Sequence, residues 1–232
     1  MNVKITGFKE QPLLSPPKLA GDDWLRPTEK DAEIISRGLD DVDSHTLARL
    51  LHSLHALGLP YDEKHVRTVL ESIPLDRRGQ NPVGLLTKYY CLKEMGRPQN
   101  IPPEDAEAMR KHVFSDPDGF QAIVRYHQMA VIGHPITLDD ETRRIFPEVV
   151  RHARADGNGM MLSRAMFHLM GLGMEVKPTA EDLQMFKDDL ERHRQSEARD
   201  FLSSMLLYVN GIIPPRENGS REFMPPLKRF RR

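Results

Sequence analysis

The segment LLTKYYCLKEMGRP (85–98) decides the fold: an apolar, aromatic-rich run that ends in Gly96, with a proline two residues later. A glycine at a helix end adopts the left-handed conformation at little cost, and a proline beyond it cannot continue the helix. The same arrangement recurs at intervals of 38, 37, 40 and 38 residues, at Gly58, Gly96, Gly133, Gly173 and Gly211. Such regular spacing predicts a structural repeat.

Apolar residues recur at fixed offsets before each glycine. The fourth residue before it is Leu54, Leu92, Met129, Leu169 or Leu207. Apolar residues at offsets of 3, 4 and 7 define one face of a helix, so each glycine is expected to end a helix. A second helix is expected to follow, with Asp62, Thr137 and Thr179 as N-caps. Thr28 with Asp31 predicts one more such helix.

The predicted fold is therefore all-α, an array of about five antiparallel helix hairpins that forms an open horseshoe or partial toroid. The hairpins span residues 44–211. In the last copy several columns carry polar residues, such as Asp200 and Asn210. This copy is interpreted as a degraded terminal repeat that is exposed on its outer side.

Three segments are expected along the chain. Residues 1–26 form an extended, Pro-rich N-terminal arm that packs through Trp24, residues 27–213 form the repeat domain, and residues 214–232 form a flexible, Pro-rich, basic tail. The 232 residues carry a net charge of −1 and a single cysteine, which excludes a disulfide framework and makes nucleic-acid binding unlikely. With neither a signal peptide nor an apolar stretch that could span a membrane, the chain is predicted to be cytoplasmic.

The segments LLTKYYCLKEMGRP, FSDPDGF, IVRYHQMAVIGHP and RADGNG resemble the α/α-toroid repeats of protein prenyltransferase β-subunits and of squalene or terpene cyclases. In those repeats a helix with paired aromatics ends in Leu-Gly, and a glycine-containing loop precedes the next unit. The resemblance implies two concentric layers of helices around a central cavity.

The catalytic motifs of the resembling enzymes are absent. The chain has no Asp-x-Cys zinc pair, no D-x-D-D and no D-D-x-x-D, and Cys91 is predicted to lie on a helix face. The ten histidines include no His-x-x-x-His pair. We therefore expect no catalytic residues, no metal and no cofactor. The absent motifs argue against an enzyme without deciding the question.

One set of residues is a candidate binding surface. An aromatic or imidazole side chain stands six residues before four of the glycines, with Lys88 and Arg125 at a neighbouring offset. Stacked repeats place equivalent positions side by side, which predicts a groove for a peptide or a small amphipathic ligand. The alternative is that these rings fill the space between the helix layers. The candidate residues are His52, Lys88, Tyr89, Tyr90, Arg125, Tyr126, His127 and Phe167.

The favoured hypothesis is a non-catalytic helical-repeat scaffold that presents a concave surface to a protein or peptide partner. Two alternatives remain open. One is an isoprenoid-handling enzyme or subunit, and the other is an RNA-binding helical repeat. A cavity with convergent acids would favour the enzyme, and a groove without acids would favour binding.

Overall fold

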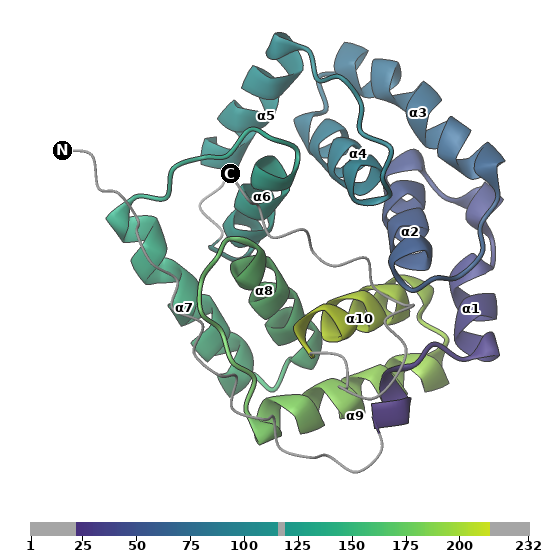
Figure 1. Cartoon of the computed structure of the whole chain (residues 1–232), viewed down its shortest axis with the longest axis vertical. Helices are drawn as coiled ribbons and strands as arrows, with labels where there is room; N and C mark the ends of the chain where they lie inside the picture. The colour runs from purple at the N-terminus through teal and green to yellow at the C-terminus, as the bar shows by residue number, and fades with distance from the viewer. Residues whose placement is uncertain (1–21, 116–118, 214–232) are drawn as a thin grey trace.

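The computed structural model describes residues 22–115 and 119–213 (Figure 1). Within these ranges the chain forms ten α-helices and two short 3-10 helices, and no strand. The predicted all-α class is confirmed. The predictions for residues 1–21 and for the tail 214–232 lie outside the described residues. Trp24 is half-buried and packs on the core.

The helices alternate along the chain between an outer and an inner layer (Figure 1). The inner helices are α2 (Ser44–Ala56), α4 (Pro82–Glu94), α6 (Gly119–Val131), α8 (Gly159–Gly171) and α10 (Arg199–Ile212). The outer helices are α1 (Glu29–Ser36), α3 (Glu63–Arg78), α5 (Pro103–Ser115), α7 (Asp140–Ala155) and α9 (Ala180–Ser196). The 3-10 helices are η1 (Asp22–Leu25), before α1, and η2 (Leu39–Asp41), between α1 and α2.

The inner layer closes into a ring. Each inner helix packs on the next, and α10 packs on both α8 and α2 (Figure 1). The five-hairpin array is thus confirmed. The sequence predicted an open horseshoe or partial toroid, whereas in the structure the two ends of the array meet. The seam is tied by side chains: Asn210 Nδ2 donates to the carbonyl of Leu25 at 3.1 Å, and Arg37 pairs with Glu197 at 2.8 Å.

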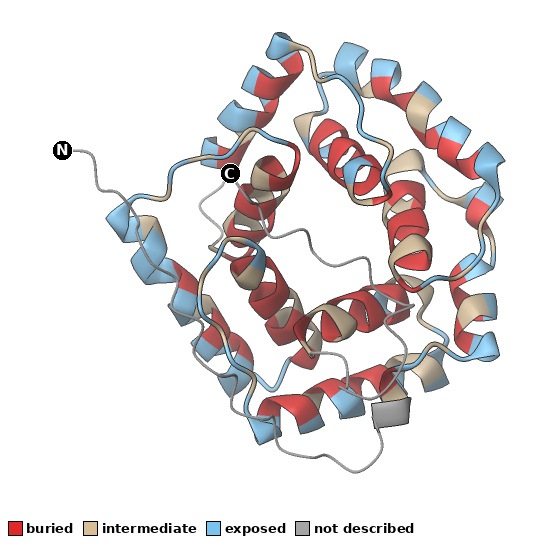
Figure 2. Ribbon diagram, in the orientation of Figure 1, coloured by how far each residue is buried: buried red, intermediate tan, exposed pale blue. Residues whose placement is uncertain are grey.

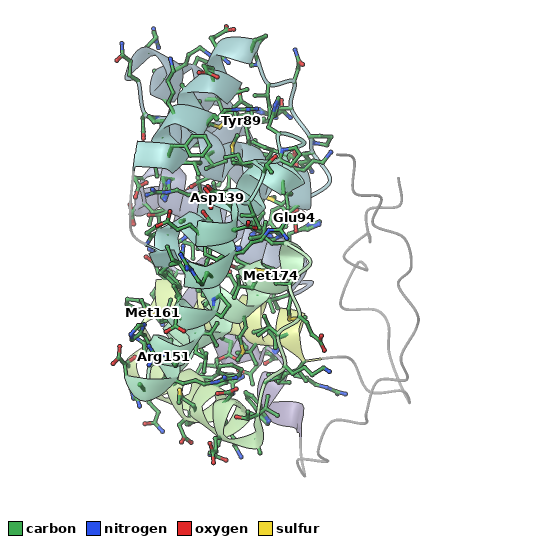
Figure 3. The ribbon with its side chains drawn as sticks, turned by 90° about the vertical axis from the view of Figure 1, so that its left-hand side faces the viewer. Tyr89, Glu94, Asp139, Arg151, Met161 and Met174 are labelled. Carbon is green, nitrogen blue, oxygen red and sulfur yellow. The ribbon has the colours of Figure 1, made fainter. Side chains whose placement is uncertain are left out.

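The inner helices all run in the same direction along the ring axis. In the edge-on view of Figure 3, Met161 near the start of α8 lies at one face of the ring. Met174, just after α8, and Glu94, at the end of α4, lie towards the opposite face. We call the face on which the inner helices begin the N-terminal face.

Four inner helices end as the glycine spacing predicts. Gly58, Gly96, Gly133 and Gly173 have φ angles of +68°, +74°, +91° and +77°. After α4, the Gly96 N–H donates to the Lys93 carbonyl and the next N–H donates to the Leu92 carbonyl, which is the Schellman arrangement. The left-handed glycine therefore satisfies carbonyl groups that the helix leaves free.

The outer helices begin at capping residues, most of them as predicted. Thr28 and Thr179 form capping boxes with Asp31 and Asp182, and Asp62 caps α3. The prediction for Thr137 is wrong. Asp139 caps α7 by accepting from the Thr142 N–H at 2.7 Å, because it lies two residues closer to the start of the helix and directly precedes Asp140.

The prediction that Gly211 ends its helix is also wrong. Each of the other four glycines lies fourteen residues after the first residue of its inner helix, and in α10 that position is Ile213. Gly211 lies inside α10, at the position that Gly171 has in α8. A side chain at Gly211 would collide with the Phe167 ring, so this glycine makes room for a neighbouring helix.

The last repeat is therefore shifted by two residues and is not degraded. With the shift, the apolar columns of α10 contain Leu202, Leu206, Val209 and Ile212, all of them buried. Burial is concentrated on the inner layer and on the inward faces of the outer helices (Figure 2). The expected core residues Leu54, Leu92, Met129, Leu169 and Leu207 are all buried.

A repeated ion pair joins successive outer helices. Arg77 and Arg154, each the fifteenth residue of its helix, hold Asp105 and Asp182, each the third residue of a following outer helix. The shortest N–O distance is 2.7 Å in both pairs. Arg194 of α9 holds Asp31 of α1 with the same geometry, at 3.0 Å, across the point where the ring closes.

Candidate functional site

The inner helices surround a cavity of about 100 Å³ at the centre of the ring. Its lining comes from all five inner helices: His45, Arg49, His52, Ser53, Val83, Leu86, Thr87, Tyr90, Cys91, Gln121, Val124, Arg125, Gln128, Arg164, His168, Ser204, Leu207 and Tyr208. The lining includes residues from the start of the inner helices, such as His45, the second residue of α2, and Gln121, the third residue of α6. The cavity therefore extends to the N-terminal face.

Two positions of every inner helix build this lining. The sixth and tenth residues of a helix lie one turn apart and share a face. The ten residues at these positions all line the cavity: Arg49, Ser53, Thr87, Cys91, Val124, Gln128, Arg164, His168, Ser204 and Tyr208. The cavity is therefore a product of the repeat, although the side chains at the equivalent positions differ.

The lining is cationic. It contains Arg49, Arg125 and Arg164, and the described lining has no aspartate or glutamate. Arg49 Nη2 donates to the Ser204 hydroxyl at 3.3 Å, which links α2 to α10. The Arg164 guanidinium lies 5.1 Å from the centre of the Phe120 ring and 6.0 Å from that of Tyr208. The partners in these contacts are uncharged, so they do not neutralise the positive charge of Arg49 or Arg164.

A belt of rings runs around the inner layer at the level of the ninth and tenth helical residues. Ring centres are separated by 5.3 Å from His52 to Tyr90, by 6.0 Å from Tyr90 to His127 and by 5.9 Å from His127 to Phe167. Phe167 lies 5.3 Å from Tyr208, the ring that α10 supplies. The aromatic row that the sequence predicted exists, and all of its rings are buried.

Glycines make room for this belt. A side chain at Gly171 would collide with the His127 ring, as one at Gly211 would collide with Phe167. These two rings therefore pack against the backbone of the following inner helix. His127 and Phe167 do not line the cavity. They pack between neighbouring helices of the inner layer, not between the two layers as the alternative proposed.

The buried histidines of the belt are held neutral. Burial lowers the pKa of His52 to about 3 and that of His127 to about 4. Burial first, and then the cost of placing a second positive charge beside His127 and Arg164, holds the pKa of His168 well below its usual value. The Nδ1 atoms of His127 and His168 are 2.8 Å apart, so one donates a hydrogen bond and the other accepts it.

Three polar atoms around the cavity have no hydrogen-bond partner within the described part of the chain. They are the hydroxyl of Tyr90, Nε2 of His168 and Nε of Arg164. Tyr90 and His168 are only 4% and 1% exposed. A buried polar group without a partner costs free energy, so three such groups at one cavity indicate a place for polar atoms that come from outside the chain.

The structure separates Lys88 from Arg125. Lys88 is 1% exposed, and its Nζ pairs with Asp76 of α3 at 2.5 Å. It therefore does not line the cavity, while Arg125, at the equivalent position of α6, does. A long cationic side chain can follow either the outer or the inner side of its helix.

Tyr89 and Tyr126 also lie away from the cavity. The Tyr89 hydroxyl donates to Asp105 at 2.7 Å, at the ion pair between α3 and α5. Burial first, and then Asp105, raise the pKa of Tyr89 to about 12. Tyr126 packs edge-on against Phe146 of α7, with ring centres 5.9 Å apart. Both tyrosines therefore serve the packing between layers.

The sequence analysis missed the cavity residues Arg49, Gln128, Arg164, His168 and Tyr208. Their signal was present in the sequence, as polar residues at a spacing of four on helices that are otherwise apolar. The two-residue shift of the last repeat hid the equivalence of the sixth and tenth residues of the inner helices. Ser204 and Tyr208 align with Arg164 and His168 only when this shift is applied.

The described residues give little support for a metal site, a thiol nucleophile or a membrane-spanning helix. No group of three or more His, Cys, Asp or Glu side chains there is arranged to hold a metal ion. Burial raises the pKa of Cys91 to about 12, so this cavity thiol is not a nucleophile at neutral pH. None of the described helices has the length and apolar character needed to cross a membrane.

Comparisons of the chain with protein-family models, with curated proteins and with solved structures found no match.

Proposed function

We propose that this protein is a non-catalytic binding protein that takes a small polar ligand into the centre of its helical ring. The observation that carries the proposal is the set of unpartnered polar atoms at the cavity, on Tyr90, Arg164 and His168. A ligand that hydrogen-bonds to them removes the cost of leaving them unsatisfied, and this gain is available only to a polar molecule.

The closed ring changes the scaffold hypothesis. An extended concave groove for a peptide needs an open array, whereas here the equivalent faces of the inner helices surround a cavity of about 100 Å³. A small ligand, or a short polar group of a larger one, matches that space better than a peptide backbone does. A groove that could stack the bases of a single RNA strand also needs an open face.

The isoprenoid-handling alternative receives less support from this site. A prenyl chain needs a large apolar cavity, and general acid chemistry needs acids that converge on the substrate. The cavity is small, and its described lining contains no carboxylate. The thiol of Cys91 and the low pKa values of the buried histidines provide neither a nucleophile nor a cationic acid at neutral pH.

A ligand screen by thermal unfolding tests the proposal. The full chain is screened against amino acids, sugars, carboxylic acids and phosphate esters, and a ligand of the folded state raises the Tm. Gln128→Trp, which places a bulky ring in the cavity, is expected to abolish the rise. Gln184→Trp, on the exposed face of α9, is the matched control and should retain it. An equal rise in the Gln128→Trp variant, or no rise with any compound, would contradict the proposal.

A further inference from the structure

The arginines at the cavity differ from those between the outer helices. Arg77, Arg154 and Arg194 each hold an aspartate through both Nε and Nη2, so their charge is compensated within the fold. Arg49 and Arg164 form no ion pair with any described residue, although both are half-buried.

An uncompensated charge that is half-buried is costly. It loses part of its hydration on folding and gains no opposite charge in return. Here the charges of Arg49 and Arg164 come from two different helices onto one cavity that has no carboxylate in its described lining. The fold therefore holds positive charge at the centre of the ring, where a bound anion would compensate it.

The donors around the cavity match the geometry of an oxyanion. A guanidinium group donates from a planar fork that fits the oxygen atoms of phosphate or carboxylate. Among the described residues, neither Nε of Arg164 nor the hydroxyl of Tyr90 has a hydrogen-bond partner, so both are donors for such a bond. The positive charge of Arg164 acts on Tyr90 and on His168, which places the three groups in one neighbourhood.

We infer that the ligand of the ring carries an oxyanion, a phosphate or a carboxylate group, and that Arg49 and Arg164 bind this group with a hydrogen bond from Tyr90. The inference rests on the proposed function and defines its ligand class. The five inner helices all begin at the face to which the cavity extends, and the partial positive charge at helix N-termini adds to the attraction. A cavity of about 100 Å³ admits such a group but not a long chain.

Calorimetric titration of the full chain at low ionic strength tests the inference. Inorganic phosphate and succinate represent the two sources of an oxyanion, and glucose is the neutral polar probe. Saturable binding of phosphate or succinate is expected, and the one that binds more tightly identifies the source. Arg164→Gln should weaken this binding at least tenfold, and Arg164→Lys, which keeps the charge, should weaken it less. Arg67→Gln, at an exposed position of α3, should leave it unchanged.

Tyr90→Phe separates a binding role from a structural one. Its buried hydroxyl has no partner among the described residues, so its removal should leave the Tm of the ligand-free protein equal or higher. The same variant should bind the oxyanion several-fold more weakly. If Tyr90 had only a structural role, Tyr90→Phe would change neither the affinity for the oxyanion nor the salt dependence of that affinity.

The outcomes distinguish this inference from the proposed function. If neutral compounds bind in the cavity while phosphate and succinate do not, the oxyanion inference is overturned and the binding function stands. If phosphate or succinate binds equally well to the Arg164→Gln variant, the anion site lies elsewhere and the inference is again overturned. If no probe and no compound of the screen binds, both proposals fail.

Discussion

His52 is a buried histidine whose burial lowers its pKa to about 3, so it contributes a pH dependence to stability. In the unfolded chain a histidine has a pKa near 6.5, so below about pH 6.5 the unfolded state binds a proton that the folded state does not. Stability from this residue is therefore present above that pH and is lost as the pH falls towards 3. The loss amounts to about 2 kcal/mol between pH 6.5 and pH 5.

We expect His52→Phe to reduce the acid sensitivity of the protein. Phenylalanine occupies the equivalent position of α8, at Phe167, so a ring is tolerated in the belt. The measurement is the free energy of unfolding in urea at pH 7 and pH 5, and the difference should shrink by about 2 kcal/mol. His152→Gln, on the exposed side of α7, is the control and should leave the difference as it is. An undiminished difference in His52→Phe would mean that His52 is not held neutral by burial.

At the level of the elements, the helix ends depend on glycines with positive φ. At Gly96, φ is +74° and no atom lies within 4 Å of an added Cβ, so only the backbone conformation opposes a side chain there. Gly96→Val is expected to reduce the free energy of unfolding by about 1 kcal/mol or more, because β-branched residues resist the left-handed region. Thermal or urea unfolding measures this loss, and an unchanged stability would show that α4 does not end in this way.

Gly211 tests a different mechanism in α10. An alanine in a helix interior is about 1 kcal/mol better than glycine by propensity, yet here its Cβ would collide with the Phe167 ring. Gly211→Ala is therefore expected to destabilise by about 1–3 kcal/mol through overpacking. The added change Phe167→Leu should recover part of the loss, and equal losses with and without it would rule out the collision.

The hairpins were predictable because a left-handed glycine leaves the same local signal in each repeat. The closure of the ring and the set of cavity-lining residues at the sixth and tenth helical positions were not predictable. Gly211 is followed by a proline like the true helix ends, but its role is to make room for Phe167, and only the tertiary contact distinguishes the two. The sequence placed Lys88 and Arg125 at equivalent positions, but it did not show that Asp76, on another helix, pairs with Lys88 and draws it outward.

At the level of the whole molecule, closure removes the exposed ends that an open repeat array must cap. The contact between α9 and α1 has the chemistry of an internal one. Arg194 donates to Asp31 through Nε and Nη2. Asp31 is also the partner of Thr28 in the capping box of α1, as Asp182 is the partner of Thr179 in α9. The first and last outer helices therefore meet as consecutive ones do.

This equivalence gives the last prediction. Arg194→Ala is expected to reduce the free energy of unfolding by about 1–3 kcal/mol, because it leaves the carboxylate of Asp31, 2% exposed, with the capping bonds alone. Arg154→Ala removes the same partner from Asp182 within the array and is the matched comparison. In a closed ring the two losses, measured by urea unfolding, should be similar. If the ends were apart in solution, Asp31 would be hydrated, Arg194→Ala would be nearly neutral, and Arg154→Ala alone would destabilise the protein.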